Sequence, residues 1–300
     1  MAVIINTNVD SLKIQSLLSN STSKMSSSMQ KMSSGLKILS AKDDAAGTVI
    51  SAKMEVQLNG NKIAQNNVQN ANALMSTVEG NLDVVQDNLS RIRDLTLQAK
   101  NGTYSSTEIE AMQDEVDQRV AEIDRISKSA KYSSMGLFGG SLATDGMTFQ
   151  VGSDAGTDNT IKADGSLFKS VEFSTLTGTA GKKFDLTSMT NSNTVTFTST
   201  EASAETGDTD FDVAVRALDA AIADVTGRKS IIGSTGNRMD SALSTLSTQY
   251  ENLSSAKSII TDADVAAEAS NFTQQQILQQ VSTSLLAQAN QAPSIALSLV

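Results

Sequence analysis

Residues 25–36 read MSSSMQKMSSGL, and their large apolar side chains recur at steps of four, three and four. Residues 239–253 repeat the same spacing near the other end of the chain. Such steps place the apolar side chains on one narrow face of a helix, as in coiled coils. The two ends therefore predict long helices that pair through a seam, either with each other or with copies of themselves. The seam residues are Met25, Met29, Met32 and Leu36 at one end, and Met239, Leu243, Leu246, Tyr250 and Leu253 at the other.

The composition favours helices over a large globular core. Aromatic residues make up 4% of the 300 residues, Trp is absent, and Pro293 is the single proline. Because proline breaks helix interiors, its scarcity permits long helices. The chain has no Cys and no His, which excludes disulfides and chemistry based on thiols or imidazole.

The charge is unevenly distributed. The net charge of −10 argues against nucleic acid as the main partner. Residues 1–42 hold five lysines against Asp10 alone, whereas the chain after Lys257 is acidic, with no basic residue. This asymmetry favours approach of the two ends, or it is an accident of a short count. No apolar run is long enough to span a membrane, and the start does not resemble a cleaved signal peptide, so we expect export without one.

The periodicity predicts six helices, over about 8–33, 56–99, 106–130, 211–225, 236–260 and 263–289, with Pro293 ending the last. A connector follows the first helix, with Ser40, Lys42, Asp43 and Asp44 in a turn, and Ser40 or Asp43 is the expected N-cap of the next helix. The helix over 56–99 has the clearest apolar repeat, at steps of three and four: Ala71, Leu74, Val78, Leu82, Val85, Leu89, Ile92 and Leu95. The apolar residues expected in the last helix are Phe272, Ile277, Val281, Leu285 and Leu286.

The middle of the chain changes character. It is rich in Gly, Ser and Thr, and strand signals occur at residues 147–151, 171–173 and 194–198. We therefore expect a mostly α (α+β) fold, with long antiparallel coiled-coil helices from both termini and small hairpins lying on the helices. Three domains are predicted: 1–42 with 262–300, 43–140 with 211–261, and a surface β region over 141–210.

Several blocks resemble bacterial flagellin. INTNV (5–9), SSGL (33–36) and SAKDDAAG (40–47) resemble its start, and QILQQ (276–280) and LAQANQ (286–291) resemble its end. The resemblance covers about residues 1–152 and 211–300, in order. The middle is shorter than in flagellins with large outer domains, and the chain ends in Val300, where many flagellins have a basic residue.

The resemblance implies a structural subunit that polymerises into the motility filament outside the cell. Its terminal helices would order and pair on assembly, and the terminal seam residues would supply polymer contacts. The implied partners are copies of itself, the flagellar type III export apparatus, a flagellin chaperone, and the filament cap and hook-junction proteins. Nucleic acid and membrane are not expected partners.

The resemblance also places Arg91, Leu95 and Glu115 in a patch that vertebrate toll-like receptor 5 recognises in flagellins. The same patch packs against the next subunit in the family, so both interpretations stay open.

No enzymatic activity, cofactor or metal is expected. Asp43 and Asp44 are adjacent carboxylates, but carboxylates on a turn without a nearby His are usually helix caps or ion-pair partners. The Ser/Thr-rich middle is either a solvated surface or a site of O-glycosylation. The rival functions are a hook–filament junction protein and a coiled-coil scaffold outside the flagellum.

Overall fold

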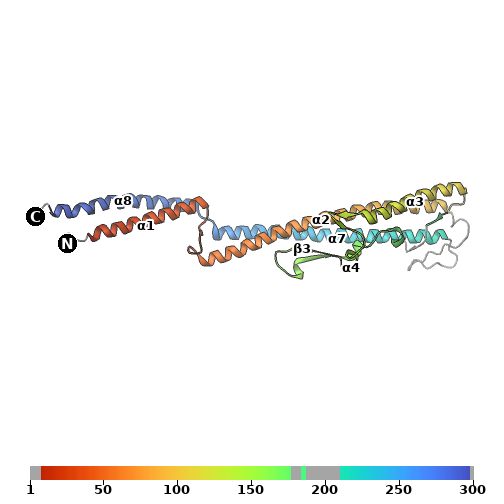
Figure 1. The fold of residues 1–300 in the computed structure, drawn as a ribbon, viewed down its shortest axis with the longest axis horizontal. Helices are drawn as coiled ribbons and strands as arrows, with labels where there is room; N and C mark the ends of the chain where they lie inside the picture. The colour runs from red at the N-terminus through yellow and green to blue at the C-terminus, as the bar shows by residue number, and fades with distance from the viewer. Residues whose placement is uncertain (1–7, 177–183, 187–209, 298–300) are drawn as a thin grey trace. The chain divides into compact units, whose positions relative to one another are not determined.

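The computed structural model describes residues 8–176, 184–186 and 210–297. Contacts divide the chain into two units: residues 1–58 with 250–300 form unit 1, and residues 59–249 form unit 2. Helix α2 (Ala45–Ala99) and helix α7 (Asp210–Thr261) each continue from one unit into the other. The expectation of a mostly helical fold with small hairpins is confirmed (Figure 1).

Unit 2 contains the hydrophobic core. Parts of α2 and α7 run antiparallel, as shown by bonds from Asn72 to Asp240 and from Arg93 to Asp219. Helix α3 (Ser106–Ser129) lies beside α2, where Arg91 binds Glu115. The apolar repeat of α2 is buried here: Leu74, Val78, Leu82, Val85, Leu89, Ile92 and Leu95. The burial of these residues confirms the predicted apolar repeat of this helix. The helices that bury it belong to the same chain.

Short elements cover these helices. Strands β1 (Lys131–Tyr132) and β2 (Met135–Gly136) form one antiparallel hairpin, and β3 (Met147–Gln150) and β4 (Thr160–Ala163) form another. The remaining short elements are α4 (Leu142–Asp145), η1 (Thr157–Asn159), η2 (Gly165–Phe168) and α5 (Phe173–Leu176). Ile161 of β4 packs with Val68 and Met239, so this hairpin lies on α2 and α7 as expected.

Unit 1 is built mainly from α1 (Val9–Ser34) and α8 (Val265–Leu297), which run antiparallel, side by side (Figure 1). Gly35, in the left-handed conformation, ends α1 by donating its N–H to the Lys31 carbonyl oxygen. Thus the first and last described helices pair with each other, whereas the seam residues predicted over 239–253 lie in α7 and not in this pair.

Three helical boundaries differ from the predictions. Helix α2 begins at Ala45, eleven residues before the expected start, because Asp44 Oδ1 accepts the Gly47 N–H at 2.9 Å and caps it. The two helices expected over 211–225 and 236–260 are one helix, α7. Its weak middle contains three glycines but is held by side chains buried every three or four residues: Val225, Arg228, Ile232, Thr235 and Met239.

The third boundary concerns Pro293, which was expected to end the last helix but lies inside α8.

The strand expected at 171–173 is also wrong: α5 begins at Phe173, whose backbone N–H donates to Asp124 Oδ1 at 2.9 Å. The strand expected at 194–198 lies outside the described residues. The three predicted domains remain a prediction.

Candidate assembly interface

Helices α1 and α8 meet through a seam with a heptad repeat. Apart from Lys31, the less exposed positions of α1 are Ser11, Ile14, Leu18, Ser21, Met25, Ser28 and Met32. Those of α8 are Glu268, Phe272, Gln275, Gln279, Ser282, Leu286 and Ala289. Their alternating steps of three and four define coiled-coil packing. Many of these seam residues are serine or glutamine, so the pair is held by few apolar contacts.

The structure divides the predicted seam residues into two groups. Four of them, Met25, Met32, Phe272 and Leu286, are half-buried in the seam. The other five are exposed: Met29, Leu36, Ile277, Val281 and Leu285. Sequence reasoning missed the serines and glutamines that occupy the seam, because it followed the large apolar side chains. A repeat of small and polar residues at the same steps was the signal that could have found them.

Three of the exposed residues, with Leu278, form an apolar ridge on α8. Ile277, Val281 and Leu285 follow at steps of four and therefore share one helix face. This apolar ridge is not part of the seam with α1. Helix α8 thus keeps its most apolar face away from its own partner helix.

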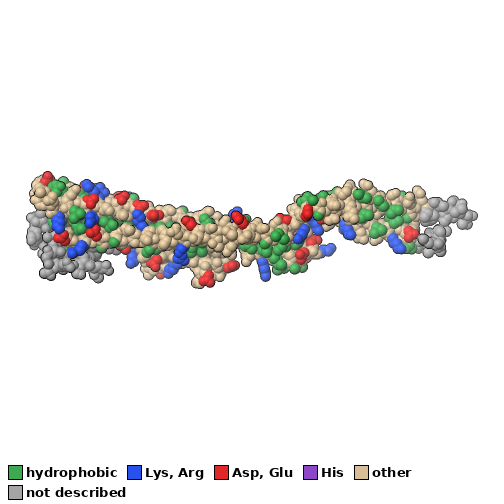
Figure 2. Space-filling view, turned by 180° about the vertical axis from the view of Figure 1, so that it is seen from behind, with side chains coloured by type: hydrophobic (Ala, Val, Ile, Leu, Met, Phe, Trp, Pro, Cys, Tyr) green, Lys and Arg blue, Asp and Glu red, His purple; other side chains and the backbone are tan. Residues whose placement is uncertain are grey.

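Unit 1 as a whole exposes apolar side chains. Of the twenty large exposed hydrophobic side chains in the described residues, sixteen belong to unit 1. Leu58 is its one buried hydrophobic residue in the described ranges. Figure 2 shows hydrophobic side chains on the surface along α1 and α8. A unit without a core of its own depends on other molecules for apolar burial.

The direct cross-links between α1 and α8 are neutral hydrogen bonds. Gln279 Nε2 donates to Thr22 Oγ1 at 3.3 Å, and Asn8 Nδ2 donates to the Ala289 carbonyl oxygen at 2.8 Å. In the described residues of these two helices, the opposite charges of the chain ends do not form an ion pair.

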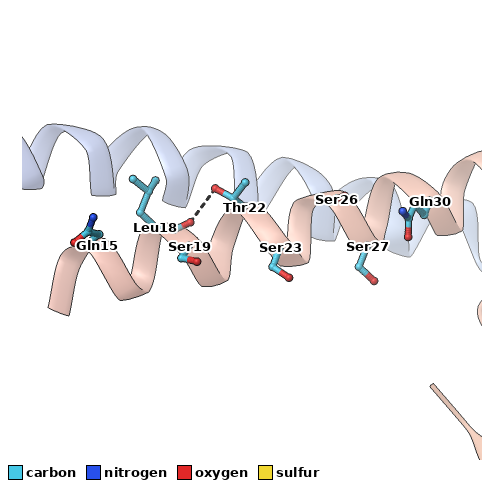
Figure 3. Close-up of a pocket in the computed structure, with 8 residues that line it drawn as sticks. All are labelled: Gln15, Leu18, Ser19, Thr22, Ser23, Ser26, Ser27 and Gln30. Atoms are coloured by element: carbon cyan, nitrogen blue, oxygen red, sulfur yellow. Dashed lines mark hydrogen bonds between the residues drawn. The ribbon is translucent and has the colours of Figure 1, made fainter. Parts of the chain in front are cut away.

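A shallow groove of about 700 Å³ follows one side of α1 (Figure 3). Its lining is polar and uncharged, apart from one leucine: Gln15, Leu18, Ser19, Thr22, Ser23, Ser26, Ser27 and Gln30. Thr22 Oγ1 donates to the Leu18 carbonyl oxygen at 2.9 Å, so this hydroxyl is bonded within its own helix. None of the lining groups is an acid, a base or an activated nucleophile, so the groove is suited to packing rather than to catalysis.

The connector between α1 and α2 is fixed by its acidic residues. Asp43 Oδ2 accepts the backbone N–H groups of Leu39 and Ser40 at 3.1 and 3.0 Å, and also the Ser40 hydroxyl. These hydrogen bonds hold the pKa of Asp43 below its ordinary value of 3.8. Asp44 caps α2, and Lys42 is exposed. Both carboxylates are used in hydrogen bonds to the backbone.

The connector is also tied to the link between α7 and α8. Leu36 and Asp262 form an antiparallel bridge, in which the Lys37 N–H donates to the Thr261 carbonyl oxygen at 2.8 Å. The Ala263 N–H donates to the Gly35 carbonyl oxygen at 2.8 Å. A Cβ on Gly47 would lie 2.5 Å from Asp44 Oδ2 and 2.7 Å from Ile38 Cδ1, so a larger residue here would displace these two side-chain ends.

The predicted receptor patch lies in unit 2, on α2 and α3. Arg91 binds Glu115 with two hydrogen bonds of 2.8 and 3.1 Å, and Arg119 Nε donates to Glu115 Oε1 at 3.0 Å. The Arg91 guanidinium, above all, holds the pKa of Glu115 below its ordinary value. Arg91 and Glu115 are 43% and 34% exposed, but Leu95 is 2% exposed and belongs to the core. The surface patch therefore consists of the charged residues without Leu95.

The described part of the chain offers no other chemical site. It contains no cluster of three or more acidic, His or Cys side chains that could hold a metal ion. Within the same residues, no helix has the length and hydropathy needed to cross a bilayer.

Two family models match the chain in order. The bacterial flagellin N-terminal helical region matches residues 5–143, and the bacterial flagellin C-terminal helical region matches residues 215–300. The chain is 34% identical over 311 residues to the flagellin of Bacillus subtilis (strain 168), and the match covers 99% of each protein. It is 33% identical to the flagellar filament 33 kDa core protein of Treponema phagedenis, covering 99% of this chain and 100% of that one.

The fold is also similar to a solved structure described as a putative flagellar hook-associated protein from Vibrio parahaemolyticus. The TM-score is 0.53 with 18% identity, over 73% of this chain and 99% of that chain. This likeness concerns the fold alone. The two family matches and the full-length relatives go further: the chain belongs to the bacterial flagellin family, and it is a structural, non-enzymatic subunit of the extracellular filament of the bacterial flagellum.

Proposed function

We propose that this subunit joins the filament through unit 1, whose helix pair becomes fully ordered only when neighbouring copies cover it. The observation that carries the proposal is the distribution of apolar side chains. Sixteen of the twenty exposed large hydrophobic side chains are in unit 1, whereas nearly all the buried ones are in unit 2. Unit 2 can fold alone, and unit 1 gains its apolar burial from other subunits.

The apolar ridge of α8 is the proposed polymer contact within unit 1. Ile277, Leu278, Val281 and Leu285 are each close to half-exposed, and the seam with α1 does not use them. Met29 and Leu36 are exposed in the same way near the end of α1. The ordering entropy of two helices of 26 and 33 residues is then offset by burial between subunits.

Hydrogen exchange of soluble subunits and of filaments tests this proposal. We expect the backbone amides of α1 and α8 to exchange quickly in the soluble subunit and slowly in the filament. Those of the α2 core around Leu82 should be protected in both. Equal protection of α1 and α8 in the two states contradicts the proposal.

Trimmed subunits provide the second test. Removal of residues 1–30 or 270–300 should abolish seeded elongation, while the melting of unit 2 is unchanged. Short rings from the full-length chain, in place of long filaments, would favour a hook-junction role. The export apparatus, a chaperone and the cap and junction proteins are the proposed partners before and during assembly, since the family requires delivery of subunits to the growing end.

Recognition by toll-like receptor 5 is a second candidate function of the soluble subunit. Arg91 and Glu115 support it, because this bonded pair presents charge at the surface of α2 and α3. Arg91→Ala should lower receptor activation in a reporter assay, while the neighbouring Arg125→Ala, on the same helix bundle, should not. Equal activation by all three proteins contradicts a role for Arg91.

A further inference from the structure

Pro293 leaves one backbone carbonyl of α8 without its usual partner. In an α-helix, the N–H of residue 293 would donate to the carbonyl oxygen of Ala289, four residues earlier. Proline has no N–H, and α8 nevertheless continues from Val265 to Leu297. The Ala289 carbonyl therefore lacks its i+4 donor and can accept a hydrogen bond from outside its own helix.

Asn8 provides that donor from the other end of the chain. Its Nδ2 donates to the Ala289 carbonyl oxygen at 2.8 Å, across a separation of 281 residues. Its Oδ1 accepts the backbone N–H of Ser11 at 3.0 Å and so caps the start of α1. The Ser11 hydroxyl then donates to Asn290 Oδ1 at 2.9 Å. The Asn8 side-chain amide thus forms hydrogen bonds both with the first turn of α1 and with the carbonyl that Pro293 leaves free. We call this arrangement of Asn8, Ala289 and Pro293 the clasp.

We propose that Asn8 and Pro293 together fix the register of α1 on α8. The seam itself defines the register weakly, because Ser21, Ser28 and Ser282 would meet similar small or polar neighbours after a shift of one heptad. A single directional polar contact is a known means of fixing register in coiled coils. A helix carbonyl that lacks its donor because of a proline four residues later occurs only at Ala289, since the chain has one proline. Asn8 can therefore satisfy it in one register.

The inference rests on the proposed pairing of α1 and α8 in the filament. If the clasp is lost, the helix pair can slide, and neighbouring subunits then meet a displaced apolar ridge. Loss of the clasp should therefore impair filament elongation and leave the stability of unit 2 unchanged, because every residue of the clasp belongs to unit 1.

Asn8→Asp separates the two roles of this side chain. Aspartate still caps α1, because it keeps an acceptor oxygen, but it has no N–H for the Ala289 carbonyl. We expect the critical concentration for seeded elongation to rise about 2- to 10-fold, as for the loss of one hydrogen bond. Pro293→Ala supplies the missing N–H within α8, so Asn8→Asp should change the critical concentration less than about 2-fold in that background.

Ser11→Ala is the matched control. It removes the neighbouring hydrogen bond to Asn290, which does not depend on residue 293, so its effect should be the same in the wild-type and Pro293→Ala backgrounds. Asn8→Asp with no effect in either background means that Asn8 is only a helix cap. An equal loss in both backgrounds means that the partner of Asn8 is not the carbonyl freed by Pro293. Either result overturns the inference.

Cross-linking measures the register directly, since the chain has no cysteine of its own. Thr22→Cys with Gln279→Cys marks the register of the structure, in which these two side chains are hydrogen-bonded. Thr22→Cys with Leu286→Cys marks a shift of one heptad. With a short bis-maleimide, Asn8→Asp should move intramolecular cross-links in filaments from the first pair to the second. An unchanged pattern overturns the inference, and a trimmed subunit that still elongates overturns the proposed function instead.

Discussion

Ile277→Ala tests the apolar ridge with a magnitude that follows from the structure. Full burial of an isoleucine side chain contributes about 1.5–3 kcal/mol. Ile277 is 55% exposed in the subunit, so covering the rest during assembly is worth about 0.8–1.6 kcal/mol. Alanine loses most of this contribution. At about 1.4 kcal/mol for each tenfold change, the critical concentration for elongation should rise about 4- to 15-fold.

The assay is seeded elongation of purified subunits, followed by sedimentation and measurement of the protein left in solution. Ile277→Val should give a smaller increase in the critical concentration, because it removes one methylene group. Leu82→Ala is the contrasting variant: its side chain is fully buried in unit 2, so its loss should destabilise the soluble subunit by about 2–5 kcal/mol.

Thermal unfolding of the soluble subunits separates the two effects. Ile277→Ala should have the melting temperature of the wild-type protein, and Leu82→Ala should have a lower one. The reasoning is refuted if Ile277→Ala elongates at the wild-type critical concentration. It is also refuted if this variant lowers the melting temperature of the soluble subunit as much as Leu82→Ala does.

Four further predictions concern Gly80, Gly47, the connector and the surface patch. Gly80→Ala should stabilise the soluble subunit by about 0.5–1 kcal/mol in thermal unfolding, because a Cβ there meets open space in an exposed helix position. Gly47→Ala should raise the critical concentration for seeded elongation, because its Cβ displaces the Asp44 carboxylate that caps α2. Asp43→Ala should lower filament stability at neutral pH, and its difference from wild type should vanish as the pH falls through the lowered pKa of Asp43, below 3.8, in a light-scattering titration. Glu115→Gln should likewise destabilise the soluble subunit at neutral pH, and denaturant unfolding should show this difference shrinking below about pH 4.5, since protonation of Glu115 removes the same ion pair from the wild type.

The sequence predicted the core of unit 2 well and the seam of unit 1 only in part. In α2, the residues from Leu74 to Leu95 are buried as expected, because the strongest apolar repeat there faces helices of the same chain. In α8, the apolar residues at 277, 281 and 285 face away from α1. A hydrophobic period identifies a face that will be buried, but it does not identify the molecule that buries it.

Local rules failed where tertiary contacts outweigh them. The glycines in the middle of α7 suggested two helices, yet Arg228 is buried there and binds Asp224 and the Lys169 carbonyl oxygen, which holds the helix together. Pro293 suggested a helix end, yet Asn8 compensates for the hydrogen bond that it removes. The partner that decides each case, Lys169 or Asn8, lies far away in the sequence, so no local pattern could reveal it.

The bridge between Leu36 and Asp262 has a consequence for the order of folding. Closing a flexible loop of roughly 200 residues costs about 5 kcal/mol of chain entropy, and a folded α2–α7 core removes most of this cost by bringing the loop ends together. We therefore expect the pair of α1 and α8 to form after the core, since its contacts join distant residues such as Asn8 and Ala289, 281 positions apart. A chain cut short before α8 folds its core but never completes the pair. Under the proposed assembly through unit 1, we expect such an unfinished subunit to be excluded from the polymer.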